Sequence, residues 1–237
     1  MIPTAPHTEQ VFIVGDIHGC LGSLEHLLRK ACFNPDIHQL VSVGDTLNRG
    51  PHNLGVLQLL TRMGARIVQG NHERGLLYAT AQEYAPAWFD PKTFCPDLIK
   101  NGQSDRWLSS IADWPLWIET EDWIVVHAGL HPVRPLESTS PTFLTSVRAC
   151  TAEGMLPSTV NVDGAASKPS MAFQPWHDFY KGEKPIFYGH WAQQGIHSTE
   201  HTHCLDGGCV YGRELVGCWL PSLTLVRVPG EAHARIS

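Results

Sequence analysis

The chain has 237 residues, of which 43% are hydrophobic and 17% are charged, and its formal net charge is −6. These values predict a single globular domain, residues 1–237, with a sizeable core. The acidic balance argues against stable nucleic-acid binding, which would gather Lys and Arg on one face. No apolar run approaches the roughly 20 residues that cross a bilayer, and we recognise no secretory signal, so we expect a cytoplasmic protein without a membrane partner.

The seven cysteines include no close CxxC pair, which is typical of reduced thiols in the cytosol. Cys204 and Cys209 have the spacing of half a zinc site. Thiols of the core or of a loop are the favoured interpretation of this pair.

The first part of the chain predicts three strands, each followed by a helix. The expected strands are residues 10–14, 40–43 and 65–68. The expected helices are residues 21–31, 51–64 and 72–78. Apolar residues fall on one face of the first helix at the positions Leu21, Leu24, Leu27, Leu28 and Ala31. Alternation of strands and helices predicts an α/β fold with a largely parallel sheet.

Residues 83–102 lose this periodicity and are interpreted as an inserted loop over the site. Their aromatic side chains, which either stack on a base or pack on the domain surface, are Trp88, Phe89 and Phe94. A helix is expected at 104–113, with Trp107, Leu108 and Ile111 facing inward. Residues 116–119 and 123–126 then predict a β-hairpin that ends at His127.

Residues 131–184 are irregular apart from a short helix expected at 142–147, and such segments are commonly functional loops or lids. The remaining chain predicts four strands, with Pro221 and Ser222 in the turn between the last two. These strands are residues 186–188, 203–205, 215–220 and 223–228.

Polar side chains follow five of the apolar strands, usually beside glycine. They are Asp16, His18, Asp45, Asn71, His127 and His190. Any one of them is ordinarily a turn, cap or hydrogen-bonded residue. Together they predict one site, because the carboxyl ends of parallel strands meet at the same edge of a sheet. Carboxylate, imidazole and amide ligands suit two divalent metal ions, manganese first, with iron, zinc or cobalt as alternatives.

Asp45 follows the middle strand of the first three and is expected to bridge the two ions. Two ions about 3.5 to 4 Å apart hold a hydroxide that attacks phosphorus in line. The reaction class is therefore hydrolysis of a phosphate ester or phosphoanhydride, without a phosphoenzyme.

Five motifs carry a resemblance to a known family: GDIHG at 15–19, GDTLNRG at 44–50, GNHE at 70–73, HAG at 127–129 and GHW at 189–191. In this order they resemble the calcineurin-like metallophosphoesterases of the phosphoprotein-phosphatase type. The stretches 188–192 and 204–212 resemble the symmetrical diadenosine tetraphosphatases of that family more than the protein phosphatases. The resemblance implies a β-sandwich flanked by helices, with irregular cap insertions at about 81–113 and 131–184.

The resemblance also implies residue roles. It places Asp16, His18 and Asp45 on the first metal. It places Asp45, Asn71, His127 and His190 on the second metal. His72 matches a general acid, and Arg49 and Arg148 match arginines that bind phosphate oxygens. Asn48 departs from the protein phosphatases, which carry Asp there; an amide supports imidazolium less than a carboxylate does, which favours anhydride substrates with good leaving groups.

The first functional hypothesis is symmetrical hydrolysis of diadenosine tetraphosphate to two ADP, with RNA carrying a nucleoside-tetraphosphate cap as a further substrate. The alternative is a serine/threonine protein phosphatase with the same metal site, favoured by Glu73 after Asn71 and His72. A binding module with an inactive site is disfavoured because every expected ligand is present. The sequence leaves open the oligomeric state, the preferred base and the native metal.

Overall fold

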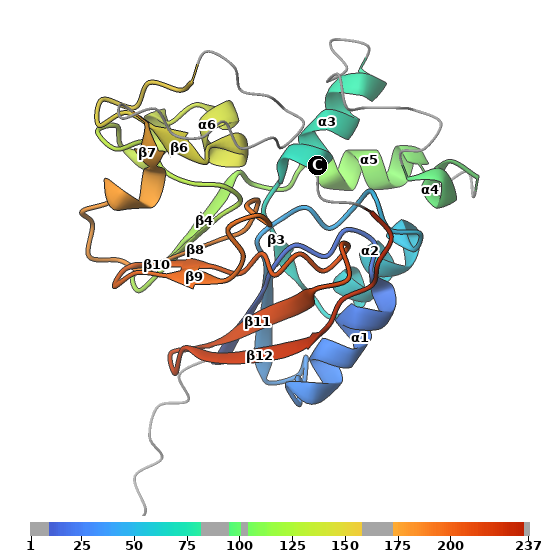
Figure 1. Cartoon of the computed structure of the whole chain (residues 1–237). Helices are drawn as coiled ribbons and strands as arrows, with labels where there is room; N and C mark the ends of the chain where they lie inside the picture. Colours follow the sequence, from blue (N-terminus) through green and yellow to red (C-terminus); the bar gives the residue numbers. More distant parts are fainter. Residues whose placement is uncertain (1–9, 82–94, 101–103, 158–172, 235–237) are drawn as a thin grey trace, which may run out of the picture.

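Two five-stranded sheets pack against each other in the computed structural model, which describes residues 10–81, 95–100, 104–157 and 173–234 (Figure 1). The first sheet has the order β12-β11-β1-β2-β3 and the second the order β4-β5-β8-β10-β9. The strands of the first sheet are β1 (Gln10–Val14), β2 (His38–Ser42), β3 (Arg66–Ile67), β11 (Glu214–Leu220) and β12 (Thr224–Pro229). Those of the second are β4 (Trp117–Glu119), β5 (Ile124–Val126), β8 (Ile186–Tyr188), β9 (His197–Ser198) and β10 (Thr202–Cys204).

Helices flank the two sheets. They are α1 (Leu21–Lys30), α2 (Asn53–Arg62), α3 (Asn71–Thr80), α4 (Pro96–Lys100), α5 (Ser104–Ala112) and α6 (Pro141–Ser146). Shorter elements are the 3₁₀ turns η1 (Leu136–Ser138) and η2 (Trp176–Asp178) and the strand pair β6 (Ala149–Cys150) and β7 (Gln174–Pro175). No helix in the described ranges has both the length and the apolar character needed to cross a membrane.

Alternation of side chains along the strands builds the layers. In β1, Ile13 packs into the core between the sheets, whereas Phe12 packs outward with Leu24 of α1. In β8, Phe187 points into the same inner core, whereas Tyr188 packs outward with Phe143 of α6. Each sheet therefore buries both of its faces, and the predicted sandwich flanked by helices is confirmed.

The prediction of a largely parallel sheet is wrong for the sheets as a whole. Three neighbouring strands are parallel in each sheet, namely β1, β2 and β3 in the first and β5, β8 and β10 in the second. The other strands, β4, β9, β11 and β12, pair antiparallel. The C-terminal hairpin of β11 and β12 returns to β1, a pairing between distant segments that no local pattern encodes. The two predicted hairpins are confirmed, and β2 lies between β1 and β3 as expected.

Helix α4 lies within the segment 83–102, for which we expected only an inserted loop. Its Asp97 carboxylate accepts hydrogen bonds from Leu54 N at 2.7 Å and from Asn53 Nδ2 at 2.8 Å. Asp97 thereby supplies the cap that the N-terminus of α2 lacks, since carboxylates stabilise that end of a helix. The described part of this segment packs on α2, and the aromatic residues Trp88, Phe89 and Phe94 lie outside the described residues.

Candidate metal centre

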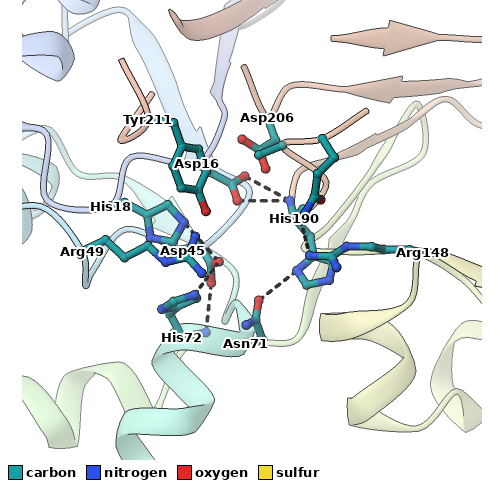
Figure 2. Close-up of a pocket in the computed structure, with 12 residues that line it drawn as sticks. Asp16, His18, Asp45, Arg49, Asn71, His72, Arg148, His190, Asp206 and Tyr211 are labelled. Atoms are coloured by element: carbon teal, nitrogen blue, oxygen red, sulfur yellow. Dashed lines mark hydrogen bonds and ion pairs between the residues drawn. The ribbon is translucent and has the colours of Figure 1, made fainter. Parts of the chain in front are cut away.

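The parallel strands of both sheets deliver polar side chains to one pocket (Figure 2). Asp16 and His18 follow β1, Asp45 follows β2, and Asn71 begins α3 after β3. From the second sheet come His127 after β5 and His190 after β8. The pocket is lined by eight of the nine predicted site residues, namely Asp16, His18, Asp45, Arg49, Asn71, His72, Arg148 and His190. His127, the ninth, is fully buried and contacts Asp45 and Asn71.

The backbone at the strand ends is tightly turned. His18, Asp45 and His190 have φ values of 49°, 46° and 67°, a left-handed conformation that is uncommon for residues other than glycine and that clusters at functional sites. A side chain at Gly189 would collide with the Asp16 carboxylate, and one at Gly70 with the Asp45 carboxylate. The glycines of the motifs are thus required by the close approach of the backbone to the two carboxylates.

Asp45 is shared by two clusters of candidate ligands. One contains His18, Asp45 and His72 and the other Asp45, His127 and His190, and the ligand atoms within each lie within 4.8 Å of one another. Oδ2 of Asp45 lies 3.5 Å from His18 Nε2, and Oδ1 lies 3.4 Å from His127 Nε2. Asp45 is thus the residue that the two candidate groups have in common.

Backbone carbonyls fix the tautomers of the three ligand histidines. Nδ1 of His18 lies 2.9 Å from the Leu47 carbonyl, and Nδ1 of His127 lies 2.9 Å from the Val43 carbonyl. For His190 the nitrogen is Nε2, 3.2 Å from the Ser146 carbonyl. A carbonyl only accepts hydrogen bonds, so these nitrogens carry the protons and the other ring nitrogen of each histidine presents a lone pair to the site.

Two of these ring nitrogens face Asn71. Its Oδ1 lies 2.9 Å from His190 Nδ1 and 3.1 Å from His127 Nε2. Burial lowers the pKa of His190 well below its usual value, which keeps its ring neutral. Burial also acts to lower the pKa of His127, but the Asp45 carboxylate raises it by stabilising positive charge there. Acceptor atoms brought this close are stabilised by a cation among them, and the residues present therefore fit a bound metal ion.

Buried negative charge supports the same conclusion. Asp16, Asp45 and Asp206 all line the pocket and are 2%, 2% and 4% exposed. Burial raises the pKa of Asp16 well above its usual value and that of Asp206 to about 6. Burial also acts to raise the pKa of Asp45, but the neighbouring His127 and His72 hold it well below its usual value. Divalent cations would neutralise this group of carboxylates.

Sequence reasoning missed Asp206 and Tyr211 as pocket residues. Asp206 follows β10, the third parallel strand of the second sheet, and lies beside glycine, but this glycine follows the aspartate, whereas glycine precedes Asp16 and Asp45. Its place after a strand, within the stretch 204–212 that resembles the tetraphosphatases, could have identified it. Tyr211 lies in the same stretch and reaches the pocket from the turn between β10 and β11.

Two arginines complete the pocket. The guanidinium of Arg49 lies over the Tyr211 ring, 5.4 Å from its centroid. Arg148 donates from Nη2 to the His190 carbonyl at 3.4 Å, and its buried Nε has no hydrogen-bond partner. The arginine and lysine ion pairs found among the described residues are Lys184 with Glu119 and Arg227 with Glu214. Arg49 and Arg148 are therefore available to an anionic ligand such as phosphate.

His72 is oriented by Asn48. Oδ1 of Asn48 accepts from Arg49 N at 2.7 Å, which directs Nδ2 of Asn48 toward His72 Nδ1 at 2.8 Å. Because Nδ2 donates, His72 Nδ1 accepts, and the proton of the neutral ring is on Nε2. This nitrogen lies 3.8 Å from Asp45 Oδ2. His72 thus directs an N–H toward the carboxylate shared by both clusters.

The parallel strands of the two packed sheets end at one set of carboxylate, imidazole and amide side chains. Beside them lie two arginines that form no ion pair among the described residues. This arrangement defines a hydrolase of phosphate esters or anhydrides. The family model described as calcineurin-like phosphoesterase matches residues 10–194. The chain belongs to this family, and the resemblance inferred from the five motifs is confirmed.

Several relatives have a more specific description. Proteins named symmetrical bis(5'-nucleosyl)-tetraphosphatase from Pectobacterium atrosepticum and Dechloromonas aromatica are 29% and 28% identical to this chain. The first alignment covers 86% of this chain and 89% of the relative, and the second covers 93% and 97%. A crystal structure assigned provisionally as a diadenosine tetraphosphatase is 31% identical, covers 97% of both chains and has a TM-score of 0.78. A protein serine/threonine phosphatase from Saccharomyces cerevisiae, 16% identical with a TM-score of 0.60, shares the fold.

Proposed function

We propose that this chain hydrolyses dinucleoside tetraphosphates symmetrically, converting diadenosine tetraphosphate and water to two ADP at a dinuclear metal centre. The observation that carries the proposal is Asp45, whose carboxylate belongs to both ligand clusters. The curated relatives named above support the choice of substrate. In the reaction, the oxygen of water bonds to phosphorus as the central P–O–P bridge breaks, and the leaving group is a nucleoside diphosphate.

Two sets of residues would hold the metals. Asp16, His18 and Asp45 would hold one. Asp45, Asn71, His127 and His190 would hold the other. When bound, such ions lower the pKa of water and neutralise charge on phosphate oxygens. Manganese suits this mixture of oxygen and nitrogen ligands best, and iron, zinc and cobalt are the alternatives.

The protein groups around the metals would position the polyphosphate and move a proton. Arg49 and Arg148 offer planar guanidinium groups that match phosphate oxygens. Nε2–H of His72 would donate a hydrogen bond to the leaving phosphate oxygen. A neutral imidazole keeps its proton, and a hydrogen bond suffices for a nucleoside diphosphate because this leaving group carries its negative charge readily.

Capped RNA and phosphoproteins are the other substrates to compare. RNA with a 5′ nucleoside-tetraphosphate cap contains the same anhydride chain, so the same centre would cleave it. The argument for a phosphoprotein rested on Glu73, which has a different explanation in the structure. Its carboxylate accepts hydrogen bonds from the backbone of Asp45, Thr46 and Gly70, and it orders the ligand loop.

Product analysis tests the proposal. Purified protein with Mn²⁺ is incubated separately with diadenosine tetraphosphate, capped RNA and a phosphoserine peptide, in water enriched in ¹⁸O. We expect ADP as the sole nucleotide product from diadenosine tetraphosphate, with one labelled oxygen per pair of ADP molecules. AMP together with ATP would exclude symmetrical cleavage, and dephosphorylation of the peptide alone would replace the proposal with the phosphatase alternative.

A further inference from the structure

A second group of potential metal ligands lies outside the pocket. The ligand atoms of Cys20, Glu231 and His233 lie within 4.8 Å of one another. The side chain of Cys209 interacts with that of Cys20, so a second sulfur lies next to this group, although it is not among the atoms that lie within 4.8 Å of one another. None of these four residues lines the pocket or has a part in the proposed reaction.

The fold brings the four residues together from three distant parts of the chain. Cys20 precedes α1 directly, Cys209 lies in the turn between β10 and β11, and Glu231 and His233 follow β12. Helix α1 packs beside β11 and β12 (Figure 1). Cys204, which has the sequence spacing of half a zinc site with Cys209, directs its thiol to the Gly189 carbonyl, in keeping with a thiol of the core.

Backbone hydrogen bonds fix this arrangement independently of the side chains. Glu231 N donates to the Cys209 carbonyl at 2.9 Å, and His233 N donates to the Val210 carbonyl at 2.9 Å. The segment after β12 is therefore aligned along the turn that carries Cys209. This alignment holds Cys209 at a constant separation from Glu231 and His233.

The spacing of the polar ligands suits a tetrahedral ion. Glu231 Oε2 lies 2.9 Å from His233 Nε2. Ligands bound at about 2.0 Å in a tetrahedron lie roughly 3.3 Å apart, so a small outward shift of the two side chains would admit the metal. The other oxygen of Glu231 accepts from Ser23 N at 2.8 Å, which would orient the carboxylate as an outer partner does in known sites.

Burial is also suitable. Cys20 and Cys209 are 0% and 1% exposed, whereas the His233 and Glu231 side chains are 31% and 27% exposed. The sulfur ligands are thus protected from solvent, and the histidine and carboxylate leave a path for the ion to enter.

We propose that Cys20, Cys209, Glu231 and His233 bind a structural zinc ion, separate from the dinuclear centre. Cys20, Glu231 and His233 supply three ligands, and a shift of the Cys209 thiol toward them would complete the four of a closed zinc site. Thiolates select zinc over manganese. Without a metal, Glu231 still caps α1 and pairs with His233, but those contacts leave the second buried thiol without a role. The ion would join the loop of Asp16 and His18 to the turn that carries Asp206 and Tyr211.

Cobalt spectroscopy tests the site without measuring turnover. Protein freed of metal under reducing conditions is titrated with Co²⁺, and the near-ultraviolet absorption of thiolate-to-cobalt charge transfer is recorded. We expect this band to saturate at one equivalent in the wild type, because the ligands of the dinuclear centre include no sulfur. The band should persist in Asp45→Ala and disappear in Cys209→Ser. Zinc content by mass spectrometry should show one tightly held equivalent.

Two further variants keep the test decisive if Cys209→Ser fails to fold. His233→Ala alters a side chain near the surface and should weaken Co²⁺ binding at the thiolates by at least about tenfold. Cys32→Ser, at an exposed free thiol, is the matched control and should leave the band unchanged. The proposal is overturned if the reduced wild type shows no charge-transfer band, if freshly purified protein carries a disulfide between Cys20 and Cys209, or if His233→Ala binds as tightly as wild type.

Discussion

The carboxylate of Glu73 accepts a hydrogen bond from the backbone N–H of Asp45 over 2.9 Å. The same carboxylate accepts hydrogen bonds from the backbone N–H groups of Thr46, Leu47 and Gly70. One fully buried anion thus holds the loop that presents the shared metal ligand. Glu73 therefore stabilises the loop of Asp45 without lining the pocket itself.

Glu73→Gln should destabilise the protein and loosen the site. The amide cannot accept all of these hydrogen bonds, and leaving buried N–H groups unpaired should lower the free energy of unfolding by on the order of 3 kcal/mol. Urea denaturation of the metal-free protein measures this loss. Glu25→Gln, at an exposed position of α1, is the matched control, and equal stability of the two variants would contradict the role assigned to Glu73.

Asp45→Asn should remove both ions of the dinuclear centre together. The amide keeps the shape of the side chain but lacks the charge needed to bridge two cations, so kcat should fall by roughly 10³-fold. Equilibrium dialysis with Mn²⁺ counts the bound ions, and Asp36→Asn at an exposed site is the control. Retention of one tight Mn²⁺ ion in Asp45→Asn would show that Asp45 belongs to a single metal.

Asn48 variants should change the response to the leaving group. Asn48→Ala removes the hydrogen bond that orients His72 and should lower kcat by about 10- to 100-fold with little change in KM. Asn48→Asp should restore the orientation and increase the population of the protonated ring, which can transfer a full proton to the leaving group, because a carboxylate stabilises the imidazolium form. We expect it to raise the rate on an alkyl phosphate relative to diadenosine tetraphosphate. An unchanged ratio of the two rates would separate Asn48 from leaving-group protonation.

Arg148→Ala should weaken the interaction with the polyphosphate. The guanidinium has a buried Nε without a hydrogen-bond partner. Loss of the guanidinium should lower kcat/KM by roughly 10²-fold. Arg148→Lys should recover only part of this kcat/KM, because lysine cannot bind two oxygens in one plane. Steady-state kinetics measure both effects. The control is Arg134→Ala at an exposed position, and wild-type kinetics in Arg148→Ala would remove this arginine from the substrate site.

The pH dependence of the metal-free protein should reveal Asp206. Burial raises its pKa to about 6 in the folded protein, so the folded state binds the proton more tightly than the unfolded state does. Stability from this group is therefore greatest below the unfolded pKa of about 4 and is lost as the pH rises through about 6, by on the order of 3 kcal/mol. The ionised carboxylate attracts cations into the pocket that it lines, so metal binding should weaken as the pH falls through about 6.

Thermal unfolding of metal-free protein at a series of pH values measures this effect. The melting temperature of the wild type should fall across the interval in which Asp206 ionises, and that of Asp206→Asn should fall less. Parallel pH curves for the two proteins would show that the Asp206 carboxyl titrates normally.

The amino-acid sequence by itself determined the predicted ligand set and the local units that carry it. Strand, glycine and ligand are adjacent in the chain, so the patterns around Asp16, Asp45 and His190 could be read directly. Helix periodicity likewise placed α1, α2 and α5 to within a few residues, because the apolar face of a helix repeats locally. Asp206 also follows a strand and lies beside glycine, but there the glycine comes after the ligand candidate, so the order that marks Asp16 and Asp45 is absent.

Only the tertiary structure decided which distant segments meet. The antiparallel return of β11 to β1 made both sheets mixed, Asp97 of α4 became the cap of α2, and Cys209 met Cys20 instead of Cys204. Each of these contacts joins residues whose own neighbours in sequence carry no sign of the partner. Periodicity reports which side of an element is buried, whereas the identity of the surface that buries it follows from packing the whole chain.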